Sequence, residues 1–141
     1  MSFAEGETYH LLLCYACNDP QGAVMALNDL TEDPLDAAVL LGTLAHAVAL
    51  PLPAPRPDLP VTPLVVDGYG DPAPLDAPEW TVARLVAAAA ADDDEMLRDL
   101  SLAVMHRDDD GESYAEIVSS LIPMAVQTLV AMELLPSASR N

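Results

Sequence analysis

The chain has 141 residues, which is enough for one domain with a single hydrophobic core. Twenty-three Asp and Glu residues face five Arg and no Lys, so the net charge at pH 7 is −18, while hydrophobic residues make up 52% of the chain. A surface this negative repels nucleic acid and anionic membranes, which argues against direct binding to either.

The start of the chain and its cysteine content predict a cytoplasmic protein. Residues 1–7 are polar and acidic, unlike a secretory leader, and Cys14 and Cys17 suit a reducing compartment. The longest weakly charged stretch, 117–132, has 16 residues and contains Ser, Gln and Thr. A membrane-spanning helix needs about 20 predominantly apolar residues, so we expect no membrane segment.

Proline and acidic residues divide the first third of the chain into three helices. Asp19 before Pro20, and Asp33 before Pro34, each place an N-cap aspartate ahead of a proline at the first helical position. The third helix carries almost no charge after Asp36, so it should be buried on most sides. The expected helices cover 7–18, 20–30 and 35–50.

A proline-rich stretch follows, over 51–78. It holds nine of the thirteen prolines, and this density excludes regular helix and favours extended backbone. A loop of this length inside a compact domain is uncommon. The chain is therefore expected to form one helical domain, 1–141, with N-terminal helices over 1–50, a Pro-rich extended loop over 51–78, C-terminal helices over 79–135 and a flexible tail over 136–141.

The last part of the chain contains three further helix-start signals. These are Asp76 with Glu79, the acidic run 92–95, and a capping box formed by Ser113 and Glu116. The expected helices cover 78–91, 93–106 and 113–135. The predicted fold is all-α, a bundle of five or six helices with the Pro-rich loop between helices three and four.

The strongest functional signal is a surplus of apolar helix. The last helix has no charge between Glu116 and Glu133, and the third helix has almost none after Asp36. A single small globule has limited room to hide both, so we expect a homodimer, with a filled monomer core as the alternative. The predicted interface residues are Ile117, Leu121, Ile122, Met124, Leu129 and Met132.

Clustered carboxylates could bind a partner protein with a basic surface. The alternatives are that these acids only cap helices, or that they mimic nucleic acid and inhibit a basic partner. Mimicry needs ordered rows of charge, whereas these acids gather at turns. The residues of this predicted acidic surface are Asp92, Asp93, Asp94, Glu95, Asp108, Asp109, Asp110 and Glu112.

His10, Cys14 and Cys17 form a candidate metal site. Positions i, i+4 and i+7 share one face of a helix, so three soft ligands could converge on an ion. A closed zinc site needs a fourth ligand, and the chain has no second Cys-x-x-Cys. We prefer the alternative in which the cysteines pack inward as small hydrophobic side chains.

The sequence contains no motif that assembles a catalytic site. It has no glycine-rich phosphate loop, no nucleophile elbow and no His-Glu-x-x-His, so we lean against an enzyme and expect no cofactor. The preferred hypothesis is a small acidic cytoplasmic interaction module, accessory or regulatory in role and acting as a homodimer. The alternatives are the nucleic-acid mimic and the metal-binding protein.

Overall fold

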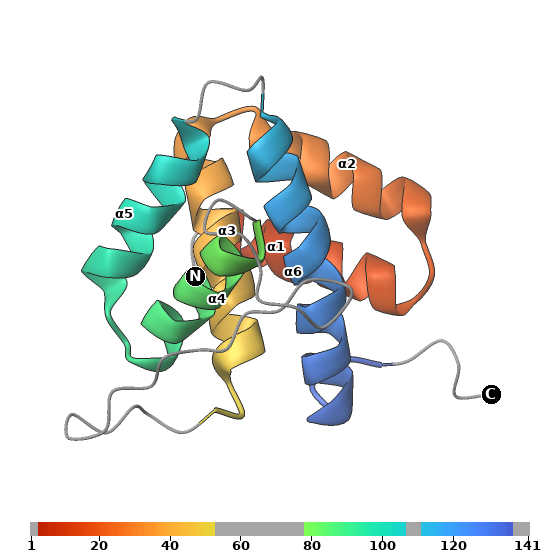
Figure 1. Cartoon of the computed structure of the whole chain (residues 1–141). Coiled ribbons are helices and arrows are strands. Elements are labelled where there is room, and N and C mark those ends of the chain that lie inside the picture. Colours follow the sequence, from red (N-terminus) through yellow and green to blue (C-terminus); the bar gives the residue numbers. More distant parts are fainter. Residues whose placement is uncertain (1–2, 53–77, 107–110, 137–141) are drawn as a thin grey trace.

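The computed structural model describes residues 3–52, 78–106 and 111–136, which fold into six α-helices without a strand in these ranges (Figure 1). The predicted all-α fold is therefore confirmed. Most of the Pro-rich segment, 53–77, and part of the predicted acidic surface, 108–110, lie outside the described residues. The helices are α1 (Phe3–Ala16), α2 (Pro20–Thr31), α3 (Pro34–Ala49), α4 (Pro78–Ala90), α5 (Asp94–Met105) and α6 (Glu112–Ala131).

Aspartate N-caps begin three of these helices, as the sequence predicted for Asp19, Asp33 and the run at 92–95. The Asp19 carboxylate accepts a hydrogen bond from the Gly22 N–H at 3.0 Å. The Asp33 and Asp93 carboxylates accept equivalent bonds at 2.8 Å and 3.1 Å. Each bond satisfies one of the N–H groups that the first helical turn leaves without a partner.

The predicted capping box at the start of α6 is wrong. The helix begins at Glu112, and its N-cap is Gly111, which has φ of 81° and makes no side-chain capping bond. A glycine adopts this left-handed conformation without steric cost. Ser113 and Glu116 therefore lie inside the first and second turns of α6 rather than at its boundary.

Three helices end through a residue other than glycine in the left-handed conformation. These residues are Asn18, Asp92 and Glu133, with φ of 58°, 53° and 62°. At the first, the Asp19 N–H donates back to the Cys14 carbonyl at 2.8 Å, as in a Schellman motif. The same motif closes α4 and α6, so sharp turns rather than long loops end these helices.

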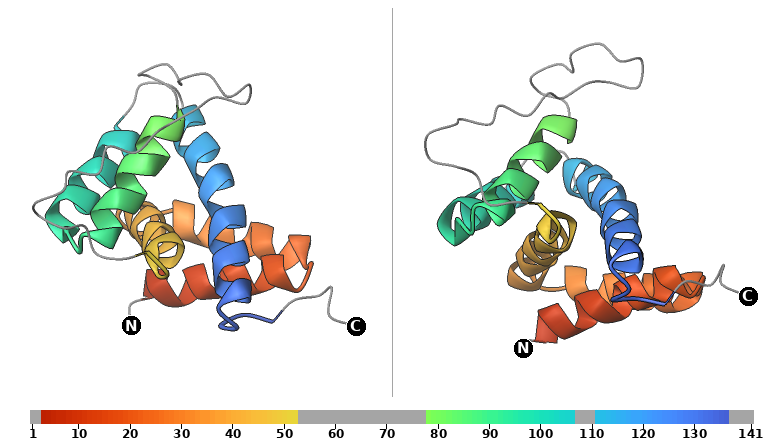
Figure 2. Two further views of the ribbon diagram at one scale, coloured as in Figure 1. Left: turned by 60° about the horizontal axis from the view of Figure 1, so that its bottom comes forward. Right: turned by 90° about the horizontal axis from the view of Figure 1, so that it is seen from below.

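Helix α3 is the centre of the bundle. It contacts all five of the other helices, and Figure 2 shows it between α1 on one side and α4 and α5 on the other. Its leucines Leu40, Leu41 and Leu44 are completely buried. By contrast, α1 and α5 both pack against α3 without contacting each other.

Helix α6 closes the other side of the core, and this corrects the predicted interface. Ile117, Leu121, Ile122 and Leu129 are each 2% exposed or less, because they belong to the same hydrophobic cluster as the α3 leucines. They therefore form no surface that a second subunit could cover. Of the six predicted interface residues, Met124 and Met132 are exposed, at 39% and 40%.

The α6 helix is also long and apolar enough, by length and composition alone, to cross a bilayer, and it is the one described helix of this kind. The core helix of a folded domain meets the same criterion. Here one face of α6 packs within the bundle, and the Tyr114 hydroxyl donates to the Ala37 carbonyl of α3 at 3.0 Å. A spanning role would require α6 to leave these contacts.

Candidate functional site

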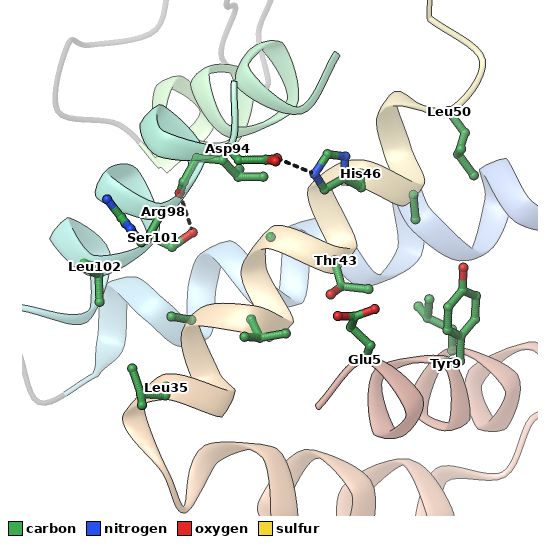
Figure 3. A pocket seen from close by; sticks show the side chains of 16 residues that line it. Glu5, Tyr9, Leu35, Thr43, His46, Leu50, Asp94, Arg98, Ser101 and Leu102 are labelled. Atoms are coloured by element: carbon green, nitrogen blue, oxygen red, sulfur yellow. Dashed lines mark hydrogen bonds and ion pairs between the residues drawn. The ribbon is translucent and has the colours of Figure 1, made fainter. Parts of the chain in front are cut away.

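The candidate site is a groove over α3 that the two helices on its sides leave open. Because α1 and α5 do not contact each other, the described helices leave a groove over the face of α3 between them, and Figure 3 shows side chains that line it. The groove has a volume of about 730 Å³ and is lined mainly by apolar atoms. Concave, mostly apolar surfaces of this size are typical of binding sites.

The floor of the groove is one stripe of α3. Its residues recur at intervals of three and four, as one face of a helix requires. Leu35 and Leu50, at its two ends, are 70% and 51% exposed. The floor consists of Leu35, Ala38, Val39, Gly42, Thr43, His46, Ala47 and Leu50.

The walls come from α1 and α5. Tyr9, which is 47% exposed, stands on the α1 wall near Leu50 (Figure 3). The two walls make the site concave, which a single exposed helix face would not be. Their residues are Glu5, Tyr9 and Leu12 on α1, and Asp94, Leu97, Arg98, Ser101 and Leu102 on α5.

Few polar groups face this groove, and two of them, His46 and Asp94, lie close together. The Nε2 atom of His46 lies 3.6 Å from Oδ1 of Asp94, which joins the floor to the α5 wall at the exposed rim. The Ser101 hydroxyl donates to the Leu97 carbonyl of its own helix at 2.8 Å. The groove is therefore suited to contact with apolar surface, with charge confined to its edges.

The three candidate metal ligands on α1 differ in their exposure, and of the two cysteines Cys14 packs inward as the preferred alternative predicts. The Cys14 Sγ atom lies 3.7 Å from Nε2 of His10, but Cys14 is buried whereas Cys17 is exposed. Across the ranges that the structure describes, no three His, Cys, Asp or Glu side chains form a group that could hold a metal ion.

Cys14 instead belongs to the contact between α1 and α2. A Cβ atom added to Gly22 would lie 2.9 Å from the Cys14 Sγ atom, so the two helices meet closely at this point. Burial raises the pKa of the Cys14 thiol, and the negative charges of Asp19, Cys17 and Glu7 raise it further. A thiol held protonated is a poor metal ligand and a poor nucleophile.

The described part of the predicted acidic surface lies at the turn between α4 and α5, with Glu112 at the start of α6. Asp93 caps α5, Asp94 pairs with His46, and Asp92 occupies the left-handed position that ends α4. Three of the four carboxylates at this turn thus have local structural roles. Only Asp94 lies in the groove.

Comparison of the chain with known proteins found no matching family model, no matching curated protein and no matching solved structure. The interpretation of the groove as a binding site therefore depends on its geometry and its lining residues alone. Sequence reasoning did not identify it, although the charge-free α3 stripe was a visible signal. The missing information was that α1 and α5 stand apart.

Proposed function

We propose that the protein is an interaction module, accessory or regulatory in role, whose groove binds an apolar helical segment of a partner protein. The observation that supports this proposal is the uncovered α3 stripe with its exposed leucines at both ends. Leaving so much apolar surface in water is unfavourable, and covering it contributes about 25 cal/mol per Å², from which the entropic and desolvation costs of association are subtracted.

The shape of the groove favours a helix over a compact small molecule. The stripe from Leu35 to Leu50 extends for about 22 Å, at about 1.5 Å per residue along a helix axis. Ala38 is a small, half-buried residue of the stripe, so another helix can approach closely there, whereas Gly42 faces Leu97 of α5 and Ala47 is buried. Amphipathic helices bind such grooves through apolar anchors spaced three and four residues apart.

Charge makes another protein a better occupant than a second copy of this chain. Two copies would each bring a net charge of −18 to the contact, and this repulsion opposes association. Four of the six residues that predicted a homodimer are also buried inside the monomer. The groove is instead the exposed remainder of the apolar surplus seen in the sequence.

A designed peptide tests the proposal with the full chain. The probe is a helix of about 16 residues with leucine at intervals of three and four and glutamine elsewhere, labelled for fluorescence anisotropy. We expect Val39→Glu, which places a charge on the groove floor, to weaken binding at least about tenfold because the charge must be desolvated. The control is Met25→Glu on α2, which is 63% exposed and outside the groove.

The proposal requires the control variant to bind within about twofold of the unaltered protein. Equal loss in both variants, or no binding to the unaltered protein, would contradict it. Sedimentation provides a second test of the proposal. A dimer that dissociates in Val39→Glu but not in Met25→Glu would make the groove a self-interface and would overturn the partner proposal.

A further inference from the structure

We infer that the groove selects helices that carry basic residues beside their apolar stripe, level with Glu5 and Asp94 in the half of the groove nearer Leu50. This inference rests on the proposed function and specifies the chemistry of the partner. The observation behind it is the position of the charged side chains around the groove, which is independent of the groove's volume and apolar lining.

Two carboxylates of the described residues line the groove, and they stand on opposite walls. Glu5 projects from α1 beside Thr43, and Asp94 projects from α5 beside His46 (Figure 3). Both carboxylates are exposed, and the Asp94 side chain is 86% exposed. A helix lying on the α3 stripe would thus pass between two negative charges, one on each side.

The surrounding helices strengthen this negative field. The three helices that form the groove carry six carboxylates and one arginine. The arginine, Arg98, also lines the groove, and it lies 4.0 Å from its neighbour Asp99 in a pair whose side chains are both largely exposed. The six carboxylates are Glu5, Glu7, Asp36, Asp94, Glu95 and Asp99.

In the half of the groove nearer Leu35 no carboxylate of the described residues belongs to the lining, which gives the occupant a direction. Leu35 on α3 and Leu102 on α5 mark this end, and neither lining carboxylate lies beside them (Figure 3). A partner helix with basic residues at one end only therefore fits in one orientation. Charge at such a rim contributes to specificity and to the rate of encounter.

Three peptides of one design separate this inference from the proposed function. They share the leucine stripe of the glutamine probe, and the positions beside the stripe at one end are lysine, glutamine or glutamate. We expect affinity to fall in that order at pH 7.5, with about fivefold or more between neighbours at low salt. The difference should shrink at 0.5 M salt because the carboxylates are exposed.

Matched protein variants locate the effect. Glu5→Gln with Asp94→Asn should remove most of the lysine peptide's advantage over the glutamine peptide, leaving less than about twofold. The control pair, Glu116→Gln with Glu133→Gln, changes the net charge equally through exposed residues outside the groove. It should keep the advantage within about twofold. Circular dichroism melts confirm that both double variants remain folded.

The outcomes distinguish the two proposals. Equal binding of all three peptides, abolished by Val39→Glu, would overturn the basic-partner inference and leave the groove as a binding site. Equal loss in both double variants would mean that net charge, rather than the two wall carboxylates, attracts the peptide, and would also overturn the inference. Failure of every peptide to bind would overturn the proposed function itself.

Discussion

Helices α3 and α6 look alike in sequence but use their apolar residues differently. Both have long stretches without charge, and both bury large side chains in one core. The outward face of α6 carries uncharged polar residues, among them Ser119, Ser120 and Gln127, which are exposed. The outward face of α3 instead carries Leu35, Val39 and Leu50.

The difference shows that an absence of charge does not identify the surface on which a partner binds. Serine and glutamine tolerate water, so the exposed side of α6, which also carries Met124, is only partly apolar. Exposed leucine and valine arranged in a concave stripe form a contiguous apolar surface, and such surfaces mark interaction sites. Substitutions in these two helices test this contrast.

The largest effect is expected in the buried face of α6. Leu121 is completely buried, so Leu121→Ala should destabilise the domain by about 2–5 kcal/mol through lost burial and a residual cavity. Met124→Ala, on the exposed side of the same helix, should cost less than about 1 kcal/mol. Urea unfolding measures both changes, and similar losses would show that the two faces of α6 are not distinct.

The hydrogen bond between α6 and α3 should give a smaller effect. Tyr114→Phe removes the hydroxyl that donates to the Ala37 carbonyl at 3.0 Å, which should cost about 0.5–1.5 kcal/mol. Double-mutant cycles with a distant surface change should be additive, because the lost interaction is local. An unchanged unfolding midpoint would mean that water replaces this bond without cost.

The same tyrosine predicts a pH dependence. Burial raises the pKa of Tyr114 above its ordinary value of 10.0, so the unfolded chain loses this proton first. The stabilisation is therefore complete below about pH 10 and falls as the pH rises further, by up to about 1.4 kcal/mol per pH unit. The raised pKa of buried Cys14 makes stability fall with rising pH in both the unaltered protein and Tyr114→Phe. The difference between the two proteins therefore isolates the contribution of Tyr114. Parallel curves between pH 9 and 11 would contradict the prediction.

The C-terminus of α6 allows a stabilising substitution for which the C-terminus of α3 has no equivalent position. Glu133 has φ of 62°, whereas the C-cap of α3, Leu50, keeps right-handed geometry. Glu133→Gly should therefore stabilise the domain by about 0.5–1 kcal/mol, because glycine adopts this conformation without strain. Glu133→Ala removes the same charge but keeps the Cβ atom, so it should give no such gain in a thermal melt.

The smallest effect on stability is expected on the groove floor. Val39→Ser should change the free energy of unfolding by no more than about 0.5 kcal/mol, because the side chain is already 36% exposed. Val118→Ser on α6 should cost at least about 1 kcal/mol, because Val118 is only 3% exposed and its replacement buries a hydroxyl. Equal effects would show that the floor of the groove is part of the core.

Local features of this fold could be predicted from sequence because they depend on neighbouring residues. Asp19 and Asp33 cap their helices through bonds to N–H groups two or three positions away, and proline after each fixes the first turn. The predicted start of α6 was wrong because the backbone of Gly111 forms the N-cap. The side chains of Ser113 and Glu116 had indicated a different boundary.

The candidate site could not be predicted in the same way because it depends on how helices cross. The apolar stripe of α3 was visible, but whether α1 and α5 would meet over Val39 is decided by packing between distant segments. For the same reason Ile117 and Leu121 were assigned to a subunit interface. Their spacing indicates a buried helix face, but it does not show which element covers that face.

The close approach of α1 and α2 at Gly22 gives the protein an internal reporter of its own motion. Cys14 is only 5% exposed, with Gly22 of α2 close to its sulfur, whereas Cys17 is open to solvent three residues later. Alkylation of Cys14 should therefore require α1 and α2 to separate locally, and the alkylation rate of Cys17 is the reference in the same molecule. The ratio of the two rates measures how often this corner of the bundle opens.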